Sequence, residues 1–187
     1  MRIGIDLDGV LYNSENWNMA FAEHYDILTS GQGVVDPTTK NIQKRYGWSD
    51  EKVLEFRAKY IPDQITKSPL MPYAIEAIKY LHKLGHEIII ITSRGLVCES
   101  HKELTKEQLL KDNVYFDDLH FAPYSKLKIV QHLNIDIMID DNASVVTELA
   151  SNNIKCLQFK SDNTKSVIAP NIEIVFNWGE VLQKLIK

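Results

Sequence analysis

"IGIDLDGV", residues 3–10, places two carboxylates, Asp6 and Asp8, where the first apolar run of the chain stops. Continuous runs of Ile, Val and Leu are typical of strands in parallel sheets, because helices cover both faces of such sheets. In open parallel sheets, ligands bind beyond the carboxyl ends of the strands. The stretch therefore predicts a buried first strand, Arg2–Ile5, that delivers both carboxylates to a ligand-binding edge.

Apolar runs of the same kind recur along the chain and alternate with helical periodicity. Further strands are predicted at Glu87–Ile91, Leu119–Ala122, Ile135–Ile139, Lys155–Phe159 and Glu173–Phe176. Helices are predicted between and after them, at Tyr73–Leu84, Lys126–Leu133, Ala143–Ala150 and Gly179–Ile186. Gly85 follows the first of these helices and is expected to end it. The alternation predicts an α/β fold, a Rossmann-like parallel sheet sandwiched by helices.

One segment, residues 14–68, breaks this alternation directly after the first strand. Its pattern is helical and rich in aromatic residues, with a polar, turn-forming stretch from Thr29 to Thr39. Prolines are expected to mark its end, at Pro62, Pro69 and Pro72. We expect a small helical cap inserted into an α/β core formed by residues 1–13 and 69–187. The alternative is a helical subdomain that only adds hydrophobic core.

Composition limits the classes of partner. The 187 residues suffice for one sizeable core with a smaller module. The net charge of -4 comes from scattered charges of both signs, so we expect no basic stripe and no nucleic acid polymer as partner. No apolar run is long enough for a membrane span, and no leader is expected. Cys98 and Cys156 fit no metal-ligand spacing, which favours reduced thiols in a cytoplasmic protein. The oligomeric state stays open, a homodimer included.

Polar side chains follow several of the predicted strands. Besides Asp6 and Asp8, the same edge receives Thr92, Ser93, Arg94, Lys126, Asp140 and Asp141. Two carboxylates about 4 Å apart repel by roughly 4 kcal/mol at an effective dielectric of about 20, so a cluster of them requires a cation or bound protons. Oxygen ligands without His or Cys favour Mg²⁺, which commonly shares its ligands with a substrate phosphate. These residues therefore predict a magnesium site and phosphoryl-transfer chemistry.

The order of these residues resembles the four motifs of the haloacid dehalogenase superfamily. The motifs are "DLDGV" at Asp6–Val10, a threonine after a later apolar run, a lysine opening a helix, and "IDD" at residues 139–141. Only a short helix and strand separate the lysine from the acidic pair, so the cap can only be the insert after the first strand. The small cap and the pattern "ITSR…K…IDDN" look most like the 5'(3')-deoxyribonucleotidase type and related bacterial nucleotidases. The resemblance spans Met1 to about Phe159.

This resemblance implies a role for each residue. Asp6 is expected to attack phosphorus and form an aspartyl-phosphate, and Asp8 to protonate the leaving group and then activate water. The Asp6 carboxylate, the Asp8 backbone carbonyl and one residue of the acidic pair, Asp141 in preference to Asp140, are expected to hold Mg²⁺. Thr92, Ser93 and Arg94 are expected to bind phosphate oxygens, and Lys126 to balance the charge there.

Each of these motifs also has a simpler interpretation when it is taken alone. Asp8 and Gly9 form a common turn opener, and Asp140 and Asp141 could cap the next helix, for which Asn142 is the expected N-cap. Lys126 could be a surface lysine, and Thr92 could simply end a strand. The joint occurrence of all these residues in order favours the site.

The expected partner is a small-molecule phosphate monoester, with a nucleoside 5'- or 3'-monophosphate favoured. Aromatic residues of the insert could stack on a base, with Trp17, Phe21, Tyr46 and Trp48 as the candidates. The same rings could instead pack the insert's own core. The alternatives are a phosphatase of sugar phosphates or other small metabolites, and a binding module without turnover on the same fold.

Overall fold

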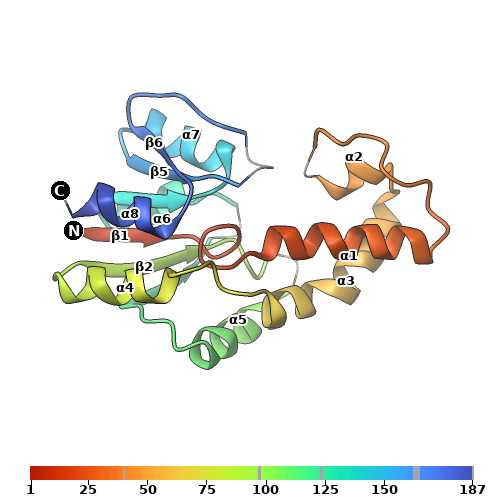
Figure 1. Cartoon of the computed structure of the whole chain (residues 1–187), viewed down its shortest axis with the longest axis horizontal. Helices are drawn as coiled ribbons and strands as arrows, with labels where there is room; N and C mark the ends of the chain where they lie inside the picture. The colour runs from red at the N-terminus through yellow and green to blue at the C-terminus, as the bar shows by residue number, and fades with distance from the viewer. Residues whose placement is uncertain (40, 97, 123, 162–164, 187) are drawn as a thin grey trace. The chain divides into compact units, whose positions relative to one another are not determined.

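The chain divides into two compact units, Met1–Tyr12 with Leu70–Lys187 and Asn13–Pro69. The structure is a computed structural model, and it describes residues 1–39, 41–96, 98–122, 124–161 and 165–186. The first unit holds the sheet, and the second consists of helices and connecting loops (Figure 1). The role of the second unit as a cap stays a prediction.

A six-stranded, fully parallel sheet forms the centre of the first unit, which confirms the predicted α/β fold. Its strands are β1 (Arg2–Ile5), β2 (Glu87–Thr92), β3 (Asp118–Phe121), β4 (Ile137–Asp140), β5 (Lys155–Phe159) and β6 (Ile172–Val175). Their order is β3-β2-β1-β4-β5-β6, so β1 lies between β2 and β4. The largest difference from the predicted strand ends is at the start of β4, predicted at Ile135 and observed at Ile137. All six strands point the same way, so their carboxyl ends share one edge.

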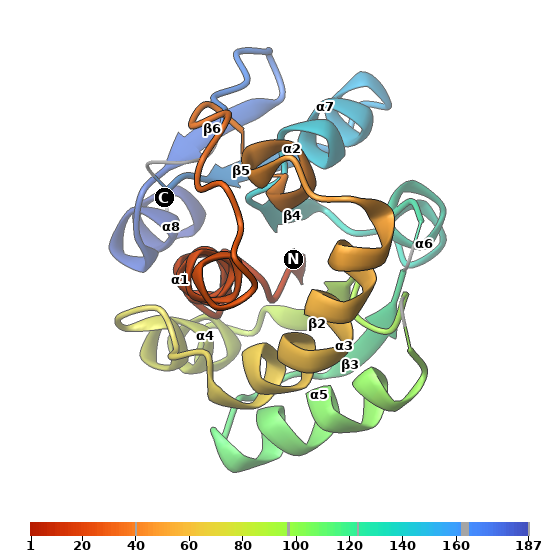
Figure 2. The same cartoon turned by 90° about the vertical axis from the view of Figure 1, so that its right-hand side faces the viewer.

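Helices cover both faces of this sheet (Figure 2). Those on one face are α4 (Ala74–Lys83), α5 (Ser100–Lys111) and α8 (Trp178–Leu185), and those on the other are α6 (Leu127–His132) and α7 (Ala143–Ser151). Along β2, Ile88 and Ile90 pack into the first core, whereas Ile89 and Ile91 pack into the second. Burial on both faces explains why the strands read as continuous apolar runs rather than as alternating ones.

Helix α4 ends as its sequence predicts. Gly85 has φ +83°, and the backbone N–H groups of Gly85 and His86 donate to the carbonyls of His82 and Leu81. A residue with a side chain would be strained in this left-handed conformation, whereas glycine is not. Asn142 likewise caps α7 as expected, since its side chain accepts a hydrogen bond from the Ser144 N–H.

Helix α5 has no counterpart among the predicted helices. Its buried positions are mostly polar: His101, Thr105, Gln108 and Leu109. Because apolar residues do not recur along that face, the sequence carries no helical hydrophobic pattern there. Thr105 donates a hydrogen bond to the His101 carbonyl, and Gln108 accepts one from Arg94 at the candidate site.

The second unit contains α1 (Ser14–Leu28), α2 (Ile42–Tyr46) and α3 (Asp50–Lys67), packed around an aromatic cluster. Pro62 does not mark the end of the insert, contrary to the prediction, but lies inside α3. A proline inside a helix costs about 3 kcal/mol because it removes a backbone donor and crowds the preceding turn. Phe56 and Ile65 are buried on either side of Pro62, and this packing offsets the cost.

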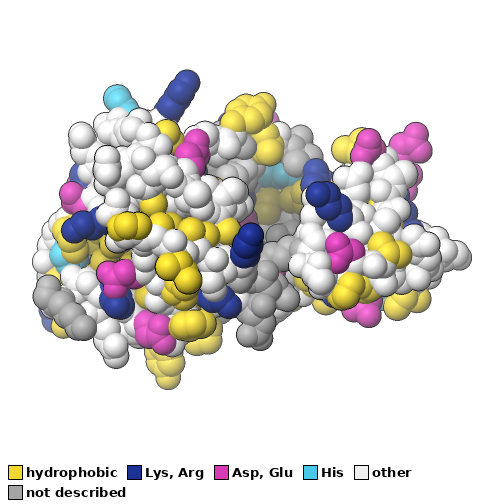
Figure 3. Space-filling model, turned by 90° about the horizontal axis from the view of Figure 1, so that it is seen from above, with side chains coloured by type: hydrophobic (Ala, Val, Ile, Leu, Met, Phe, Trp, Pro, Cys, Tyr) yellow, Lys and Arg dark blue, Asp and Glu magenta, His cyan; other side chains and the backbone are white. Residues whose placement is uncertain are grey.

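The surface of the first unit carries mixed charges. On the face seen in Figure 3, the described Lys and Arg side chains are interspersed with Asp and Glu, and hydrophobic side chains gather between them. Among the described residues, no helix has the length and hydropathy that a membrane span requires.

Candidate active site

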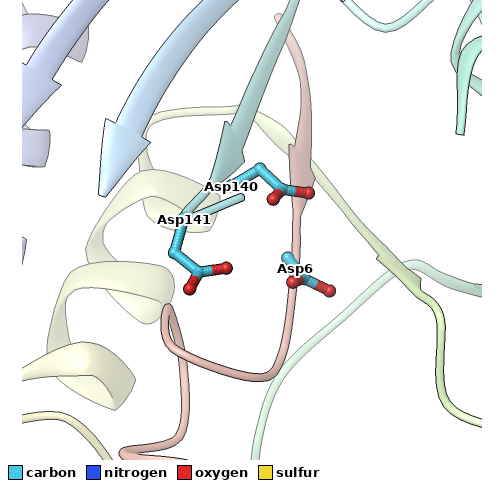
Figure 4. A group of neighbouring side chains, drawn as sticks. All are labelled: Asp6, Asp140 and Asp141. Atoms are coloured by element: carbon cyan, nitrogen blue, oxygen red, sulfur yellow. The ribbon is translucent and has the colours of Figure 1, made fainter. Parts of the chain in front are cut away.

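Three carboxylates meet at the carboxyl ends of β1 and β4 (Figure 4). Asp6 directly follows β1, Asp140 is the last residue of β4, and Asp141 follows it. The Asp6 N–H donates to the Ile139 carbonyl at 3.0 Å, which extends the pairing of the two strands up to the acidic residues. Carboxylate oxygens of the three residues lie within 4.8 Å of one another. Residues more than 130 positions apart in the sequence thus form one acidic cluster because their strands are neighbours.

The loop after β1 folds back tightly against this cluster. The Leu7 carbonyl accepts hydrogen bonds from the N–H groups of Leu11 and Tyr12, at 2.9 and 2.8 Å. Gly9 in this loop has φ +79°, and a Cβ atom at its position would lie 2.5 Å from Oδ2 of Asp141. Glycine is therefore required at this position for two reasons: its backbone conformation is left-handed, and the backbone approaches Asp141 closely.

Lys126 is buried between two of the carboxylates. Its Nζ lies 2.8 Å from Oδ1 of Asp6 and 2.6 Å from Oδ2 of Asp140. The other oxygen of Asp140 accepts a hydrogen bond from the Asn142 N–H at 2.9 Å. Both Asp140 oxygens are thus engaged inside the protein.

The electrostatics of this cluster are strongly perturbed. The pKa of Asp6 is raised to about 7: burial is the largest cause, Asp140 and Asp8 contribute to the rise, and Lys126 opposes it. Burial by itself would lower the pKa of Lys126, but attraction to Asp140 and Asp6 holds that pKa above its ordinary value. Acidic groups crowded at a sheet edge keep their charge only with such cationic partners.

Asp8 forms an ion pair with Arg94. Nε and Nη2 of Arg94 donate to the two carboxylate oxygens of Asp8, at 2.9 and 2.8 Å. The side chain of Arg94 is 4% exposed and that of Asp8 is 38% exposed. Burial by itself would lower the pKa of Arg94, but Asp8 raises it above its ordinary value. Arg94 is expected from sequence to bind phosphate, and the structure instead directs two of its nitrogens to Asp8.

Two residues that the sequence analysis does not identify, Gln108 and Tyr12, contact Arg94, and a third, Asp112, holds Tyr12. Oε1 of Gln108 accepts a hydrogen bond from Nη1 of Arg94 at 2.9 Å. The guanidinium carbon lies 5.2 Å from the centroid of the Tyr12 ring, and the Tyr12 hydroxyl donates to Asp112 at 2.9 Å. Gln108 and Asp112 lie on and just after α5, where no motif or apolar period marks them. Only the packing of α5 against the sheet brings them to the site.

The two predicted hydroxyl residues lie at the carboxyl end of β2. Thr92 is fully buried, and its Oγ1 accepts a hydrogen bond from the Arg94 N–H at 3.3 Å. Ser93 is exposed, and its hydroxyl donates to the Ala122 carbonyl at 3.2 Å. Both residues therefore lie at the same edge as the carboxylates, because β2 is the neighbour of β1.

The aromatic candidates of the insert divide into two pairs. Tyr46 and Trp48 are buried, with ring centroids 5.1 Å apart, and Trp48 donates its indole N–H to Asp26. Their rings are enclosed in the unit's own aromatic core, which is the alternative that the sequence left open, and their role in base stacking stays a prediction. Trp17 and Phe21 lie on α1 and are half-buried, with ring centroids 5.1 Å apart. Only this second pair keeps exposed ring surface.

The known proteins whose sequences match this chain include proteins named as putative nucleotidases. A protein of Oceanobacillus iheyensis named "Putative nucleotidase" is 33% identical over 125 residues, which are 63% of this chain and 62% of that protein. The match thus spans less than two thirds of the relative's length. No family model matches the chain.

Solved structures with the same fold are haloacid dehalogenase-like proteins. A hydrolase of the haloacid dehalogenase-like family from Streptococcus pneumoniae superimposes with a TM-score of 0.72 at 20% identity, covering 98% of this chain and 97% of that one. D,D-heptose 1.7-bisphosphate phosphatase from B. bronchiseptica, complexed with magnesium and phosphate, gives a TM-score of 0.59 at 11% identity, covering 100% and 98%. The resemblance predicted from the four motifs is confirmed at the level of the fold.

Proposed function

We propose that this chain is a Mg²⁺-dependent phosphomonoesterase of the haloacid dehalogenase superfamily that hydrolyses a nucleoside 5'- or 3'-monophosphate. The observation that carries the proposal is the acidic cluster of Asp6, Asp140 and Asp141 around the buried Lys126, with Asp8 two residues from Asp6. A fold alone does not define an activity, but a constellation of reactive groups at the carboxyl edge of a parallel sheet supports one.

The residues of the cluster fit a magnesium ion. All the side-chain donors are carboxylate oxygens, the ligands that Mg²⁺ prefers, and the three carboxylates lie within 4.8 Å of one another. Asp6, Asp141 and the backbone carbonyl of Asp8 are the proposed ligands, while Asp140 is held by Lys126 and Asn142. When bound, the ion supplies positive charge that offsets the repulsion between an anionic carboxylate and an anionic phosphate.

The chain's own residues divide the reaction into two steps. A carboxylate oxygen of Asp6 attacks phosphorus, an O–P bond forms to Asp6, and the ester O–P bond breaks. Asp8, which must take up a proton from water before this step, gives that proton to the departing oxygen. Asp8 then takes a proton from the water that attacks the aspartyl-phosphate, which releases phosphate and restores Asp6. Lys126 holds Oδ1 of Asp6 throughout and thereby fixes the orientation of the nucleophile.

Support for a nucleotide substrate comes from the name of the relative from Oceanobacillus iheyensis and from the half-buried rings of Trp17 and Phe21. A sugar phosphate or another small phosphorylated metabolite is the second candidate, because a solved structure with this fold is a heptose bisphosphate phosphatase. A binding module without turnover is the third. The presence of Asp6, Asp8 and Lys126 together argues against the binding module. A site that only binds phosphate does not need a second carboxylate that can act as a general acid.

Phosphate release from a panel of nucleoside monophosphates and sugar phosphates, with and without Mg²⁺, tests the proposal. We expect hydrolysis that requires Mg²⁺ and is fastest with a nucleotide. Asp6→Asn is isosteric and removes the nucleophile, so activity should vanish while the circular dichroism spectrum stays unchanged. The matched control is Asp63→Asn, since Asp63 is an exposed carboxylate of α3 paired with Lys67.

Three results would contradict parts of the proposal. No hydrolysis of any phosphate ester by the wild-type protein would favour the binding module. Activity retained in Asp6→Asn would exclude the aspartyl-phosphate route. A clear preference for sugar phosphates would replace the nucleotide as substrate but leave the phosphatase chemistry intact.

A further inference from the structure

Arg94 sits at the centre of a buried polar network beside Asp8. It follows β2, and its backbone N–H donates to Oγ1 of Thr92, the last residue of that strand. Two of its side-chain nitrogens bind the two oxygens of Asp8, and the third binds Gln108. All three guanidinium nitrogens are therefore engaged with protein groups, and the side chain is 4% exposed.

The network continues beyond the guanidinium and makes its position rigid. Gln108 is 3% exposed and lies on the face of α5 that packs against the sheet. The Tyr12 ring lies against the guanidinium, at 5.2 Å from its central carbon, and the Tyr12 hydroxyl is held by Asp112. Arg94 is thus fixed from the strand, from α5 and from the loop that carries Asp8 itself.

We propose that Arg94 is a positioning residue that holds the Asp8 carboxylate in the orientation from which it transfers protons, rather than a ligand of the substrate phosphate. The proposal rests on the phosphomonoesterase function proposed above. A planar guanidinium that binds both oxygens of a carboxylate fixes the plane of that carboxylate, which a single lysine nitrogen cannot do. Correct orientation of a catalytic group lowers the barrier because the group need not be ordered at the moment of reaction.

The exposed fractions of the two side chains support a proton-transfer role for Asp8 and a positioning role for Arg94. The Asp8 side chain is 38% exposed, so it is accessible to a leaving group and to water, whereas its partner Arg94 is buried behind it. A phosphate ligand would need its donors free to face the substrate. Arg94 is instead 4% exposed, and its hydrogen bonds from all three side-chain nitrogens go to Asp8 and Gln108.

The two roles predict different dependences on the leaving group. An alkoxide leaving group, as in an alkyl phosphate, needs protonation by Asp8, whereas the p-nitrophenolate of p-nitrophenyl phosphate leaves without much help. The value of kcat/KM reports formation of the aspartyl-phosphate, because it covers all steps up to the first irreversible one. A misplaced Asp8 should therefore slow alkyl phosphates selectively, while a lost phosphate ligand should slow both substrates alike.

The test compares Arg94→Ala, Arg94→Lys and Gln108→Leu with the wild-type protein. For Arg94→Ala we expect kcat/KM to fall about 100-fold with the preferred alkyl phosphate but less than about 10-fold with p-nitrophenyl phosphate. Arg94→Lys keeps the charge but not the two-point contact, and Gln108→Leu removes only the support from α5. In both variants kcat/KM should fall less than in Arg94→Ala, and again more with the alkyl phosphate than with p-nitrophenyl phosphate. Added guanidinium ion should partly restore Arg94→Ala.

The control is Arg2→Ala. Arg2 also binds a carboxylate through two nitrogens, at 2.7 and 2.8 Å from Glu87, but it lies at the opposite end of β1. Arg2→Ala should leave the ratio of kcat/KM for the alkyl phosphate to kcat/KM for p-nitrophenyl phosphate unchanged. Thermal unfolding of each variant separates these effects from misfolding, and Gln108→Leu and Arg94→Lys keep the test decisive where Arg94→Ala is unstable.

Inhibition by inorganic phosphate provides the second readout. If Arg94 only positions Asp8, the inhibition constant of Arg94→Ala should stay within about threefold of the wild-type value, because the phosphate site is intact. Equal losses with both substrates, or a large rise of this inhibition constant, would overturn the proposal while leaving the phosphatase function standing. A wild-type protein without any phosphatase activity would instead refute the proposed function, and this inference with it.

Discussion

At the scale of single residues, the candidate site depends on which side chain occupies each position of a crowded loop. Gly9 is the clearest case, because its φ of +79° and its contact with Asp141 both exclude a side chain. The same close contact places the loop between Asp6 and Tyr12 directly against the acidic cluster. The "DG" pair of the sequence is therefore more than a turn opener, since the glycine lets Asp141 approach the loop.

We expect Gly9→Ala to be more destabilising than Gly85→Ala. Both glycines have left-handed backbone conformations, at φ +79° and +83°, but no atom lies within 4 Å of a Cβ at Gly85. A positive φ costs an L-residue roughly 1–2 kcal/mol, so Gly85→Ala should lower the free energy of unfolding by about that amount. Gly9→Ala should cost more because it also displaces Asp141. Urea denaturation checks this, and equal losses in the two variants would contradict the close approach.

At the scale of elements, buried polar groups decide contacts that hydrophobic patterning does not reveal. Asp26, near the end of α1, is 2% exposed and accepts hydrogen bonds from the Trp48 indole, the Gly33 N–H and Lys52, at 2.6, 2.8 and 3.2 Å. It thereby ties α1 to the following loop and to α3. Burial by itself would raise the pKa of Asp26, but these three donors lower it below its ordinary value.

This lowered pKa predicts a dependence of stability on pH. A carboxylate with a lower pKa in the folded state stabilises the protein above its unfolded pKa, and that contribution is lost as the pH falls through the folded pKa. At pH 7 we expect Asp26→Asn to lower the free energy of unfolding by about 1.5–3 kcal/mol, the range for hydrogen bonds to a charged group. The difference from the wild-type protein should shrink as the pH falls below about 4.

Urea unfolding at pH 7 and at acidic pH, followed by tryptophan fluorescence, measures this effect. Asp63→Asn is the matched control, because Asp63 is an exposed carboxylate on α3 with a local lysine partner. A difference between Asp26→Asn and wild type that stays constant with pH would show that the charge of Asp26 is not what stabilises these contacts.

At the scale of the whole molecule, the order of strands decides that the acidic residues meet. Because β1 lies between β2 and β4, the residues that end these three strands share one edge. The cluster is crowded with negative charge. Among the described residues, the buried cation Lys126 lies between Asp6 and Asp140. A bound divalent ion should therefore stabilise the folded protein.

We expect Mg²⁺ to raise the melting temperature of the wild-type protein but not that of Asp141→Asn. A ligand present at 100 times its Kd stabilises the folded state by about 2.7 kcal/mol, because it binds only that state. Asp140→Asn should behave differently: it removes one of the two carboxylates that pair with Lys126 and should lower stability even without Mg²⁺. Differential scanning fluorimetry measures both. A shift with Mg²⁺ that persists in Asp141→Asn would exclude Asp141 as a ligand.

Much of this arrangement was predictable from the sequence. The apolar runs predict the strands, and polar residues that follow a parallel strand must lie at its carboxyl edge, so Asp6, Thr92 and Asp140 could be assigned to one site. Helix α5 could not be predicted, because its buried face is polar. The sequence left the burial of Tyr46 and Trp48 open, since an aromatic residue at helical spacing can pack a core or face a ligand.

The fold class and the sheet edge at which the reactive groups gather follow from the sequence, because hydrophobic periodicity and the positions just after it are local properties of the chain. The pairing of those groups follows from the folded structure: Lys126 with Asp6 and Asp140, and Arg94 with Asp8 and Gln108. The physical reason is that ion pairs and hydrogen bonds depend on distances of about 3 Å between atoms that the folding of separate elements brings together.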